Sequence, residues 1–418
     1  MPPAPEKFHP TPADRPARDF LTFIRQRFRN KAELIGDPVP WELDDKLAAY
    51  VFGERNGCAT PVRRRFDSLS ELWAAAHEMD AFVIKQPGWH SSIGIHVLQR
   101  LAENHHERGR EEERFLNLLT LRTVSADAIG NIQDQDPEYW VLEELIPSHI
   151  PGKAVPPDYK VYCFNGEPGF VLQIDRNASP PRGAIFDAAM LPLEHGRHYH
   201  FDTTKMAVGN HILPLYPAQL LHAASRLAKA TGSSFVSVDM YDGPVLGELT
   251  FAPGGPAHGM ISFSPEVLQE LDRWICGSPV TALSGLGVDL DAIRRACADE
   301  DRPLLDASSQ YAHLASAAAA GDLRYGRAFP DFPDTDRLRQ HWALAARMIG
   351  LINGDRERAL QIYRVVQKAA GFLVGLERAD EYEQLALSFC AERASTSAWH
   401  ARMQERLQSE REARLKRA

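Results

Sequence analysis

Two acidic residues, Asp239 and Glu248, lie nine positions apart, each within a short apolar run rich in strand-forming residues. Asp242-Gly243 between them is typical of a tight hairpin turn, so we expect the two carboxylates on neighbouring strands. Proteins hold Mg²⁺ at nucleotide sites with oxygens from a few side chains, and water and phosphate supply the remaining ligands. The alternative, two carboxylates on a solvated hairpin, stays open on this feature alone, but the apolar surroundings weaken it because a carboxylate there needs a partner.

A second segment has the residue types of a phosphate-binding loop. The apolar run Phe82–Ile84 ends in Lys85, and the next residues are Gln86-Pro87-Gly88-Trp89-His90-Ser91-Ser92-Ile93-Gly94. A lysine at the end of a strand supplies a point charge, and the backbone N–H groups of a Gly/Ser loop can converge on phosphate oxygens. Many strands end in lysine, so this segment alone is weak support for a phosphate site.

Two further segments continue the order. An apolar strand is interrupted by Glu143 and Glu144, and a later one begins Asp158-Tyr159-Lys160. That strand turns at Asn165-Gly166, and the chain returns through Asp175-Arg176. The succession of a lysine, a Ser/Gly loop, an acidic pair, Asp-x-Lys, Asp and Glu-x-Thr is much less expected by chance than any one motif.

In this order and these residue types the chain resembles the TupA-like branch of the ATP-grasp superfamily, which is linked to teichuronopeptide and other cell-envelope polysaccharide synthesis. The resemblance covers roughly residues 40–278, the size of one enzyme core. It implies an α+β ATP-grasp fold in which two α+β subdomains clamp ATP. The segments that carry it are Asp45-Lys46, Phe82–Lys85, Asp158–Lys160, Phe164–Gly166, Gly247–Phe251, Gly254-Gly255, Phe263–Pro265 and Asp272–Trp274.

The resemblance also implies roles for individual residues. Arg176 and Lys160 are the catalytic candidates, because Arg176 would stabilise the acyl-phosphate and tetrahedral states while Lys160 faces the phosphates. Lys46 and Lys85 would contact the phosphates from two subdomains, the Ser/Gly loop would close over the γ-phosphate, and the acidic strand would read adenine and ribose. The implied nucleotide-binding residues are Lys46, Lys85, Ser91, Ser92, Gly94, Glu143, Glu144, Leu145, Ile146, Asp158 and Lys160. The implied metal ligands are Asp239, Glu248 and Thr250.

Thr250 departs from the family pattern. ATP-grasp enzymes usually place an asparagine two residues after the metal-binding glutamate as a third ligand, and this chain has Thr250 there. A hydroxyl can still ligate Mg²⁺ or hold a bound water. The departure therefore bears on the number of metal ions and on their affinity more than on the fold.

The activity that the resemblance implies is an ATP- and Mg²⁺-dependent carboxylate–amine ligase that forms an acyl-phosphate, in cell-envelope polysaccharide or glycopeptide biosynthesis. Its substrates would be a small-molecule or carrier-linked saccharide carboxylate and an amine acceptor. The residue types suit this chemistry, since lysines, an arginine and a divalent ion offset the charge of a triphosphate. Two alternatives stay open: a phosphotransferase acting on a saccharide or small metabolite, and a non-catalytic nucleotide-binding scaffold, which Thr250 keeps in play.

Composition limits the remaining classes of function. The 418 residues carry a formal net charge of -9, which argues against a general nucleic-acid binder. The five cysteines are widely spaced, with no C-x-x-C, as expected for reduced thiols, and we therefore predict a cytoplasmic location. No apolar run approaches the ~18 residues of a membrane span, so we expect no integral membrane segment.

The chain divides into three predicted regions. Residues 1–40 form a Pro-rich disordered leader and a basic amphipathic helix from Asp19 to about Ala32, which we expect to pack on the core. Residues 41–278 form the ATP-grasp domain, with a charged helix predicted over 99–115 and another helix over 215–231. Residues 279–418 have helical periodicity, and this all-α region is a possible protein-binding module. His195, His198 and His200 lack an accompanying acid or cysteine cluster, so we do not assign them a metal.

Overall fold

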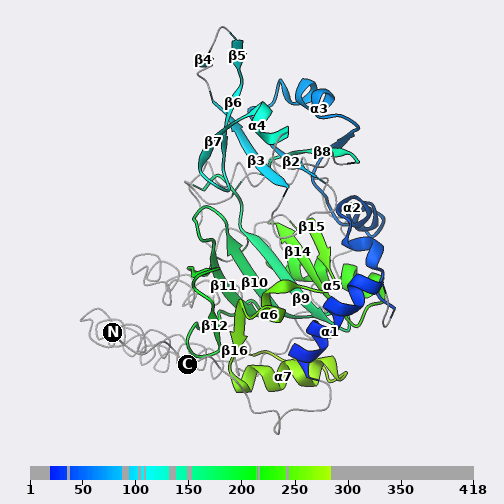
Figure 1. The fold of residues 1–418 in the computed structure, drawn as a ribbon. Coiled ribbons are helices and arrows are strands. Elements are labelled where there is room, and N and C mark those ends of the chain that lie inside the picture. Colours follow the sequence, from blue (N-terminus) through cyan, green and yellow to red (C-terminus); the bar gives the residue numbers. More distant parts are fainter. Residues whose placement is uncertain are drawn as a thin grey trace, which may run out of the picture.

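The computed structural model describes residues 19–34, 38–86, 94–101, 105–107, 110–130, 138–146, 148, 153–212, 214, 217–241 and 244–283. The region from 284 to 418, which includes nearly all of the predicted helical module, lies outside the described residues. Within the described part, two six-stranded sheets lie one above the other (Figure 1). No helix of this part is long and apolar enough to cross a bilayer.

The first sheet is antiparallel throughout, and its strand order is β1-β8-β2-β3-β6-β7. Its strands are β1 (Arg63–Phe66), β2 (Ala81–Lys85), β3 (Ile95–Arg100), β6 (Arg114–Asn117), β7 (Arg122–Ser125) and β8 (Trp140–Glu144). The helices α3 (Leu69–Ala76) and α4 (Ala126–Gly130) belong to the same half of the molecule, and a hairpin of β4 (His105–Glu107) and β5 (Arg110–Glu112) extends from it (Figure 1).

Period-two alternation gives this sheet two different faces. Phe82 and Ile84 pack with Leu72 of α3 in one apolar cluster. Val83, on the opposite face of β2, belongs to a separate cluster with Val97, Leu118 and Val155. Lys85 shares the face of Val83, so the strand that ends in the predicted phosphate lysine presents it away from the α3 side.

The second sheet has the order β13-β11-β10-β9-β14-β15 and is antiparallel except for the β11–β13 pair. Its strands are β9 (Asp158–Phe164), β10 (Glu167–Asp175), β11 (Arg182–Asp187), β13 (Ala207–Val208), β14 (Phe235–Tyr241) and β15 (Val245–Thr250). The helix α5 (Pro217–Thr231) packs against β9, β10 and β14. The short strands β12 (Tyr199–Phe201) and β16 (Ile261–Phe263) pair with each other beside α6 (Gly254–Ala257).

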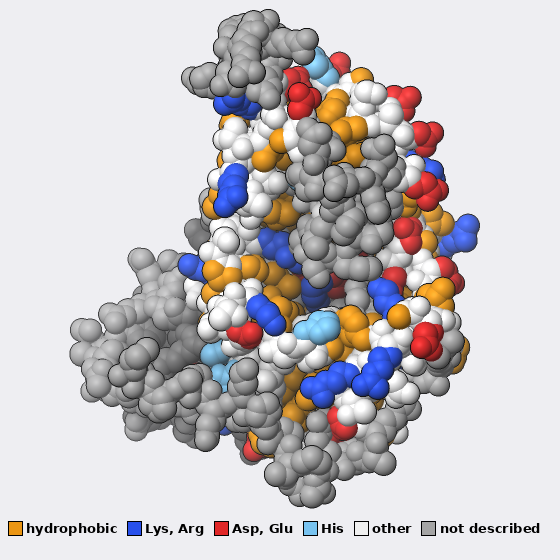
Figure 2. Space-filling view, viewed as in Figure 1, with side chains coloured by type: hydrophobic (Ala, Val, Ile, Leu, Met, Phe, Trp, Pro, Cys, Tyr) orange, Lys and Arg blue, Asp and Glu red, His pale blue; other side chains and the backbone are white. Residues whose placement is uncertain are grey.

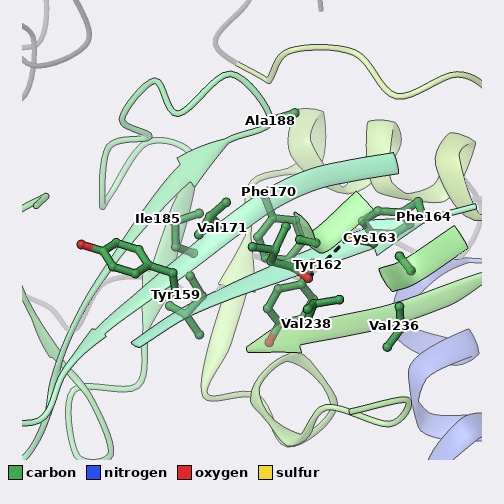
Figure 3. Packing of buried hydrophobic residues seen from close by; sticks show 14 of the residues in the cluster. Tyr159, Tyr162, Cys163, Phe164, Phe170, Val171, Ile185, Ala188, Val236 and Val238 are labelled. Carbon is green, nitrogen blue, oxygen red and sulfur yellow. Dashed lines mark hydrogen bonds between the residues drawn. The ribbon is translucent and has the colours of Figure 1, made fainter. Parts of the chain in front are cut away.

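Aromatic side chains fill the core of the second half. Tyr162 stacks on Phe170 with ring centroids 4.3 Å apart (Figure 3). Phe164 meets the edge of Trp274 at 5.2 Å, which attaches α7 (Pro265–Ile275) to the sheet. These rings belong to one apolar cluster with residues of β9 and β14, the strands that carry Asp158 and Asp239.

Helix α1 (Phe20–Glu33) packs on this core, as the sequence predicts for residues 19–32. Phe20 is fully buried, with its ring centroid 5.8 Å from that of Phe164. Arg27 is also buried, and its guanidinium donates to the Ser233 hydroxyl and the Phe235 carbonyl at 3.1 Å each. The helix therefore lies against the second sheet, while the residues before Asp19 lie outside the described part.

Helix α2 (Lys46–Arg55), preceded by the 3₁₀ turn η2 (Trp41–Asp44), lies between the two sheets (Figure 1). Asp45 caps it by accepting a hydrogen bond from Ala48 N at 2.9 Å. Gly53 allows the close approach to β15, because a Cβ there would lie 2.6 Å from Leu246 Cδ2. The helix starts at Lys46, which places that lysine in its first turn.

One sequence prediction of secondary structure is wrong. The charged segment 99–115 is not a helix but contains the end of β3, the β4–β5 hairpin and the start of β6. Arg100 and Glu113 pair at 2.8 Å at the base of this hairpin. Strand pairing across the sheet outweighed the helical preference of the charged residues. In contrast, the predicted helix over 215–231 is present as α5.

Candidate functional site

The two predicted metal carboxylates lie directly opposite each other. Asp239 of β14 and Glu248 of β15 are register partners, so their side chains emerge on the same face of the sheet. The register shifts just beyond them, which leaves Gly247 as an extra residue on β15. A Cβ at Gly247 would lie 2.9 Å from the Tyr241 ring, so only glycine fits this bulge without movement. The bulge sits beside the acidic pair, where it sets the direction of Glu248.

A lysine pairs with each of these carboxylates. Lys160 of β9 is the register partner of Asp239 and contacts its Oδ2, while Lys46 Nζ lies 3.1 Å from Glu248 Oε2. Burial raises the pKa of Asp239 to about 7, although the charge of Lys160 acts in the other direction. Burial would also raise the pKa of Glu248, but the charges of Lys46, Lys160 and Lys85 together outweigh burial and lower this pKa. The predicted metal ligands are thus held as ion pairs.

Arg176 and Asp158 extend this row of charges to the start of β9 and the end of β10. Arg176 donates from both Nε and Nη2 to Asp158 Oδ2, at 3.2 and 2.7 Å. The other oxygen, Asp158 Oδ1, is buried without a hydrogen-bond partner and lies 4.0 Å from Lys160 Nζ. The predicted catalytic pair, Arg176 and Lys160, therefore flanks one carboxylate.

Lys85 and Glu143 form a buried ion pair on the first sheet. Lys85 Nζ lies 2.6 Å from Glu143 Oε2, and the two side chains are only 8% and 3% exposed. The ammonium also donates to the Tyr50 hydroxyl at 2.8 Å. Burial, the largest single effect, lowers the pKa of Lys85, but the charge and hydrogen bond of Glu143 together with the neighbouring Tyr241 and Glu248 outweigh it and raise the pKa. Glu143 Oε1 is buried without a hydrogen-bond partner, which leaves an acceptor beside the lysine.

The predicted Ser/Gly loop connects β2 to β3. Gln86 N donates to the Gly94 carbonyl at 3.0 Å, and Gly94 has a left-handed φ of 70°, so glycine suits the end of the loop. Ser91 and Ser92 lie outside the described residues. The base of the loop is next to Lys85, and the closing role of the two serines stays a prediction.

The remaining predicted residues continue from β8 and β15. Glu144 is exposed. Its backbone N–H donates to the Val62 carbonyl at 3.0 Å, so this N–H is already paired within the protein and is not available to adenine. Leu145 packs against the Val83 cluster, and Ile146 is buried. Thr250 is the register partner of Ser237, and by alternation it shares the face of Glu248.

The site thus combines four cations and four carboxylates, and each cation has one close carboxylate partner. These pairs are Lys46–Glu248, Lys85–Glu143, Lys160–Asp239 and Arg176–Asp158. Figure 2 shows lysine and arginine side chains along the middle of this face, where the two sheets meet. No group of three or more His, Cys, Asp or Glu arranged to hold a metal occurs among the described residues. A metal held by Asp239 and Glu248 would need its other ligands from phosphate, water or a hydroxyl such as that of Thr250.

The histidine run has structural roles. His198 Nδ1 accepts a hydrogen bond from Glu194 N at 2.9 Å, and His195 Nε2 accepts one from Phe201 N at 3.3 Å. These histidines therefore help to hold the segment around β12.

Two tyrosines of the site were not predicted from the sequence. Tyr50 is fully buried and contacts Lys85, and Tyr241 is the register partner of Asp158. Tyr50 follows Lys46 by four residues in a helix, so the i, i+4 spacing was the available signal. For Tyr241 the signal was its position two residues after Asp239 on the same strand.

A family model described as TupA-like ATP-grasp matches residues 28–276, well over half of the chain. The chain belongs to the TupA-like ATP-grasp family. The two sheets are therefore the two α+β subdomains of an ATP-grasp fold. No curated protein matches the chain significantly.

Solved ATP-grasp structures are similar to this chain at low identity. They include the VanG D-Ala:D-Ser ligase from Enterococcus faecalis, at 17% identity and a TM-score of 0.34, over 56% of this chain and 61% of that one. The D-alanine–D-alanine ligase from Bacillus anthracis has 16% identity and a TM-score of 0.29, over 68% of each chain. The ATP-grasp ligase PsnB complexed with a minimal precursor has 14% identity and a TM-score of 0.27, over 50% of this chain and 52% of that one. This ATP-grasp chain thus spans about half the length of PsnB.

ATP and Mg²⁺ are the cofactors of this ATP-grasp chain. The residues present fit both groups. Asp239 and Glu248 offer carboxylate oxygens from adjacent strands, and one or two carboxylates are what Mg²⁺ sites with bound phosphates use. Lysines from both subdomains offer charge for a triphosphate, and the buried, unpartnered Glu143 Oε1 offers an acceptor for a nucleotide hydroxyl or amino group.

Proposed function

We propose that the protein is an ATP-dependent ligase that joins a carboxylate to an amine. The observation that supports it most is the row of four ion pairs where the two subdomains meet, with Asp239 opposite Glu248. Each cation in this row is already paired with a carboxylate. When ATP and Mg²⁺ bind, the phosphates would replace the carboxylates as partners of the lysines, and the divalent ions would replace the lysines as partners of the carboxylates. The net charge of the site then changes little on loading.

The proposed roles follow the positions of the side chains. Three lysines would hold the phosphates: Lys85 of the first subdomain, Lys46 of α2 and Lys160 of the second sheet. Asp239 and Glu248, with Thr250 beside them, would hold Mg²⁺, which supplies charge neutralisation for phosphoryl transfer. The apolar cluster of Val83 with Leu145 would receive the adenine. Arg176 would stabilise negative charge at the reacting carboxyl group.

The proposed chemistry balances in two steps. A substrate carboxylate oxygen attacks the γ-phosphorus of ATP, the bond from that phosphorus to the bridging oxygen breaks, and ADP leaves. The amine nitrogen then attacks the acyl carbon of the acyl-phosphate, inorganic phosphate leaves, and the amine gives up one proton. Arg176 would face the oxygen that becomes negative in this second step. Water must be kept from the acyl-phosphate, which gives the Ser91-Ser92 loop a reason to close.

The substrates are proposed only as a class. The first pair of substrates to test follows from the family to which the chain belongs. It is a saccharide carboxylate of a cell-envelope precursor with the amine of an amino acid. This version, and the predicted cytoplasmic location, rest on the family resemblance.

Product analysis tests the proposal. Purified protein with ATP, Mg²⁺ and panels of carboxylates and amines should release ADP and phosphate only when both co-substrates are present. An Arg176→Met variant should bind the nucleotide but release less phosphate, whereas Arg273→Met, at an exposed pair with Glu270, should match the wild type. Phosphate left on an acceptor without an amine would instead identify a phosphotransferase. Nucleotide binding without any turnover would favour a scaffold.

A further inference from the structure

One face of α2 contacts both halves of the candidate site. Lys46, Ala49, Tyr50 and Gly53 follow the i, i+3, i+4, i+7 spacing of a single helical face, and the last three are buried. At one end of this face, Lys46 reaches Glu248 of the second sheet at 3.1 Å. One turn later, the Tyr50 hydroxyl accepts from Lys85 of the first sheet at 2.8 Å.

The tyrosine ring is fixed from several sides. Tyr50 is fully buried, and the Arg63 guanidinium lies over its ring, 4.8 Å from the centroid. Gly53 brings the next turn of α2 against Leu246 of β15. The position of the Tyr50 hydroxyl is therefore fixed by its surroundings, and the Lys85 side chain adopts the conformation that reaches it.

The ammonium of Lys85 has three N–H groups. Two are accounted for by Glu143 Oε2 at 2.6 Å and the Tyr50 hydroxyl at 2.8 Å. Glu143 alone would leave the long lysine side chain free to rotate about one contact, whereas two fixed acceptors determine where the third N–H points. Burial, followed by the charge of Glu143, raises the pKa of Tyr50 well above its usual value, so the tyrosine stays a neutral phenol.

We propose that Tyr50 is a positioning residue that fixes the Lys85 ammonium for the nucleotide phosphates. Because Tyr50 and Lys46 share one rigid helical face, α2 sets the distance between the phosphate lysine of one subdomain and the metal carboxylate Glu248 of the other. This inference rests on the proposed ATP site. It adds a residue that touches neither the nucleotide nor the metal and acts through Lys85.

A double-mutant cycle on nucleotide affinity tests this inference, because it separates an effect through Lys85 from a general effect on the fold. The affinity for a non-hydrolysable ATP analogue with Mg²⁺ is measured by calorimetry for wild type, Tyr50→Phe, Lys85→Met and the double variant. The thermal midpoint of each ligand-free protein is recorded alongside. Tyr159→Phe is the matched control, since it removes a hydroxyl that donates to the Ile212 carbonyl at 3.0 Å and belongs to the second subdomain.

We expect Tyr50→Phe to weaken binding at least about tenfold, the effect of one lost hydrogen bond to a charged group, and Tyr159→Phe to leave it unchanged. In the Lys85→Met background, Tyr50→Phe should have no further effect on affinity. Equal losses from Tyr50→Phe in both backgrounds would assign the tyrosine a purely structural role and overturn the inference. Weaker binding by Lys85→Met with none by Tyr50→Phe would overturn it too. If Lys85→Met itself binds normally, the proposed ATP site is wrong, and the inference falls with it.

Discussion

Replacing Glu143 by glutamine should expose the energetic cost of the buried Lys85 ammonium. In the wild type the two side chains are 8% and 3% exposed and their charged atoms are 2.6 Å apart. The substitution keeps the shape but removes the charge, so a buried lysine is left with only neutral partners. Breaking such a pair costs about 3–5 kcal/mol, because the remaining charge stays desolvated. At pH 7 the thermal midpoint should fall by roughly 6–12 °C if about 3 kcal/mol is lost.

The pH dependence of this loss gives a sharper test. In the wild type the pKa of Lys85 is raised above its usual 10.5, so its stabilising contribution is complete below pH 10.5 and is lost only as pH rises through the higher folded value. In Glu143→Gln, burial is no longer opposed by Glu143 and lowers the folded pKa. The folded variant then binds fewer protons than its unfolded state, and its unfolding free energy rises as pH increases toward 10.5. The difference between variant and wild type should therefore shrink as pH rises.

Denaturant unfolding of both proteins at several values between pH 7 and pH 10 measures this difference directly. Glu270→Gln is the control, because its pair with Arg273 is exposed and should change stability by less than about 1 kcal/mol at any pH. A Glu143→Gln variant as stable as the wild type at pH 7, or a deficit that does not depend on pH, would refute the assigned role of this pair.

Two other substitutions test the packing that holds the site. Gly247→Ala should cost about 1–3 kcal/mol and weaken binding of the Mg²⁺-bound ATP analogue, because the new Cβ would lie 2.9 Å from the Tyr241 ring at the bulge beside Glu248; an unchanged denaturation midpoint with unchanged binding would contradict it. Arg27→Met should destabilise the protein by roughly 2–4 kcal/mol, since Arg27 is buried and donates to Ser233 and Phe235. The exposed Arg25→Met serves as its control in the same denaturation assay.

The sequence predicted the chemistry-bearing strands well because their signals are local. The apolar runs around Asp239 and Glu248 predicted two strands, and these strands are antiparallel register partners. The packing of α1 on the core followed equally from the periodicity of its apolar residues. The family resemblance that these motifs supported is confirmed by the family match.

The ion-pair partners could not be predicted from the sequence because they depend on how distant segments meet. Tyr50 is 35 residues from Lys85 in the chain, and only the docking of α2 brings them together. The helix predicted over 99–115 was wrong for a related reason. Its charged residues favour an exposed helix locally, whereas the pairing of β3 with β6 is a long-range contact that single-sequence reasoning does not see.

The most direct test of the central claim is calorimetric titration of Mg²⁺ with a non-hydrolysable ATP analogue into four proteins. These are the wild type, Asp239→Asn, Glu248→Gln and the remote control Glu270→Gln, each with and without Mg²⁺. Binding that requires Mg²⁺ in the wild type and in the control, and is weakened at least tenfold in both site variants, is the predicted result. Equal affinity in all four proteins, or no binding at saturating analogue, would contradict the assignment of the ATP and Mg²⁺ site to this row of charges.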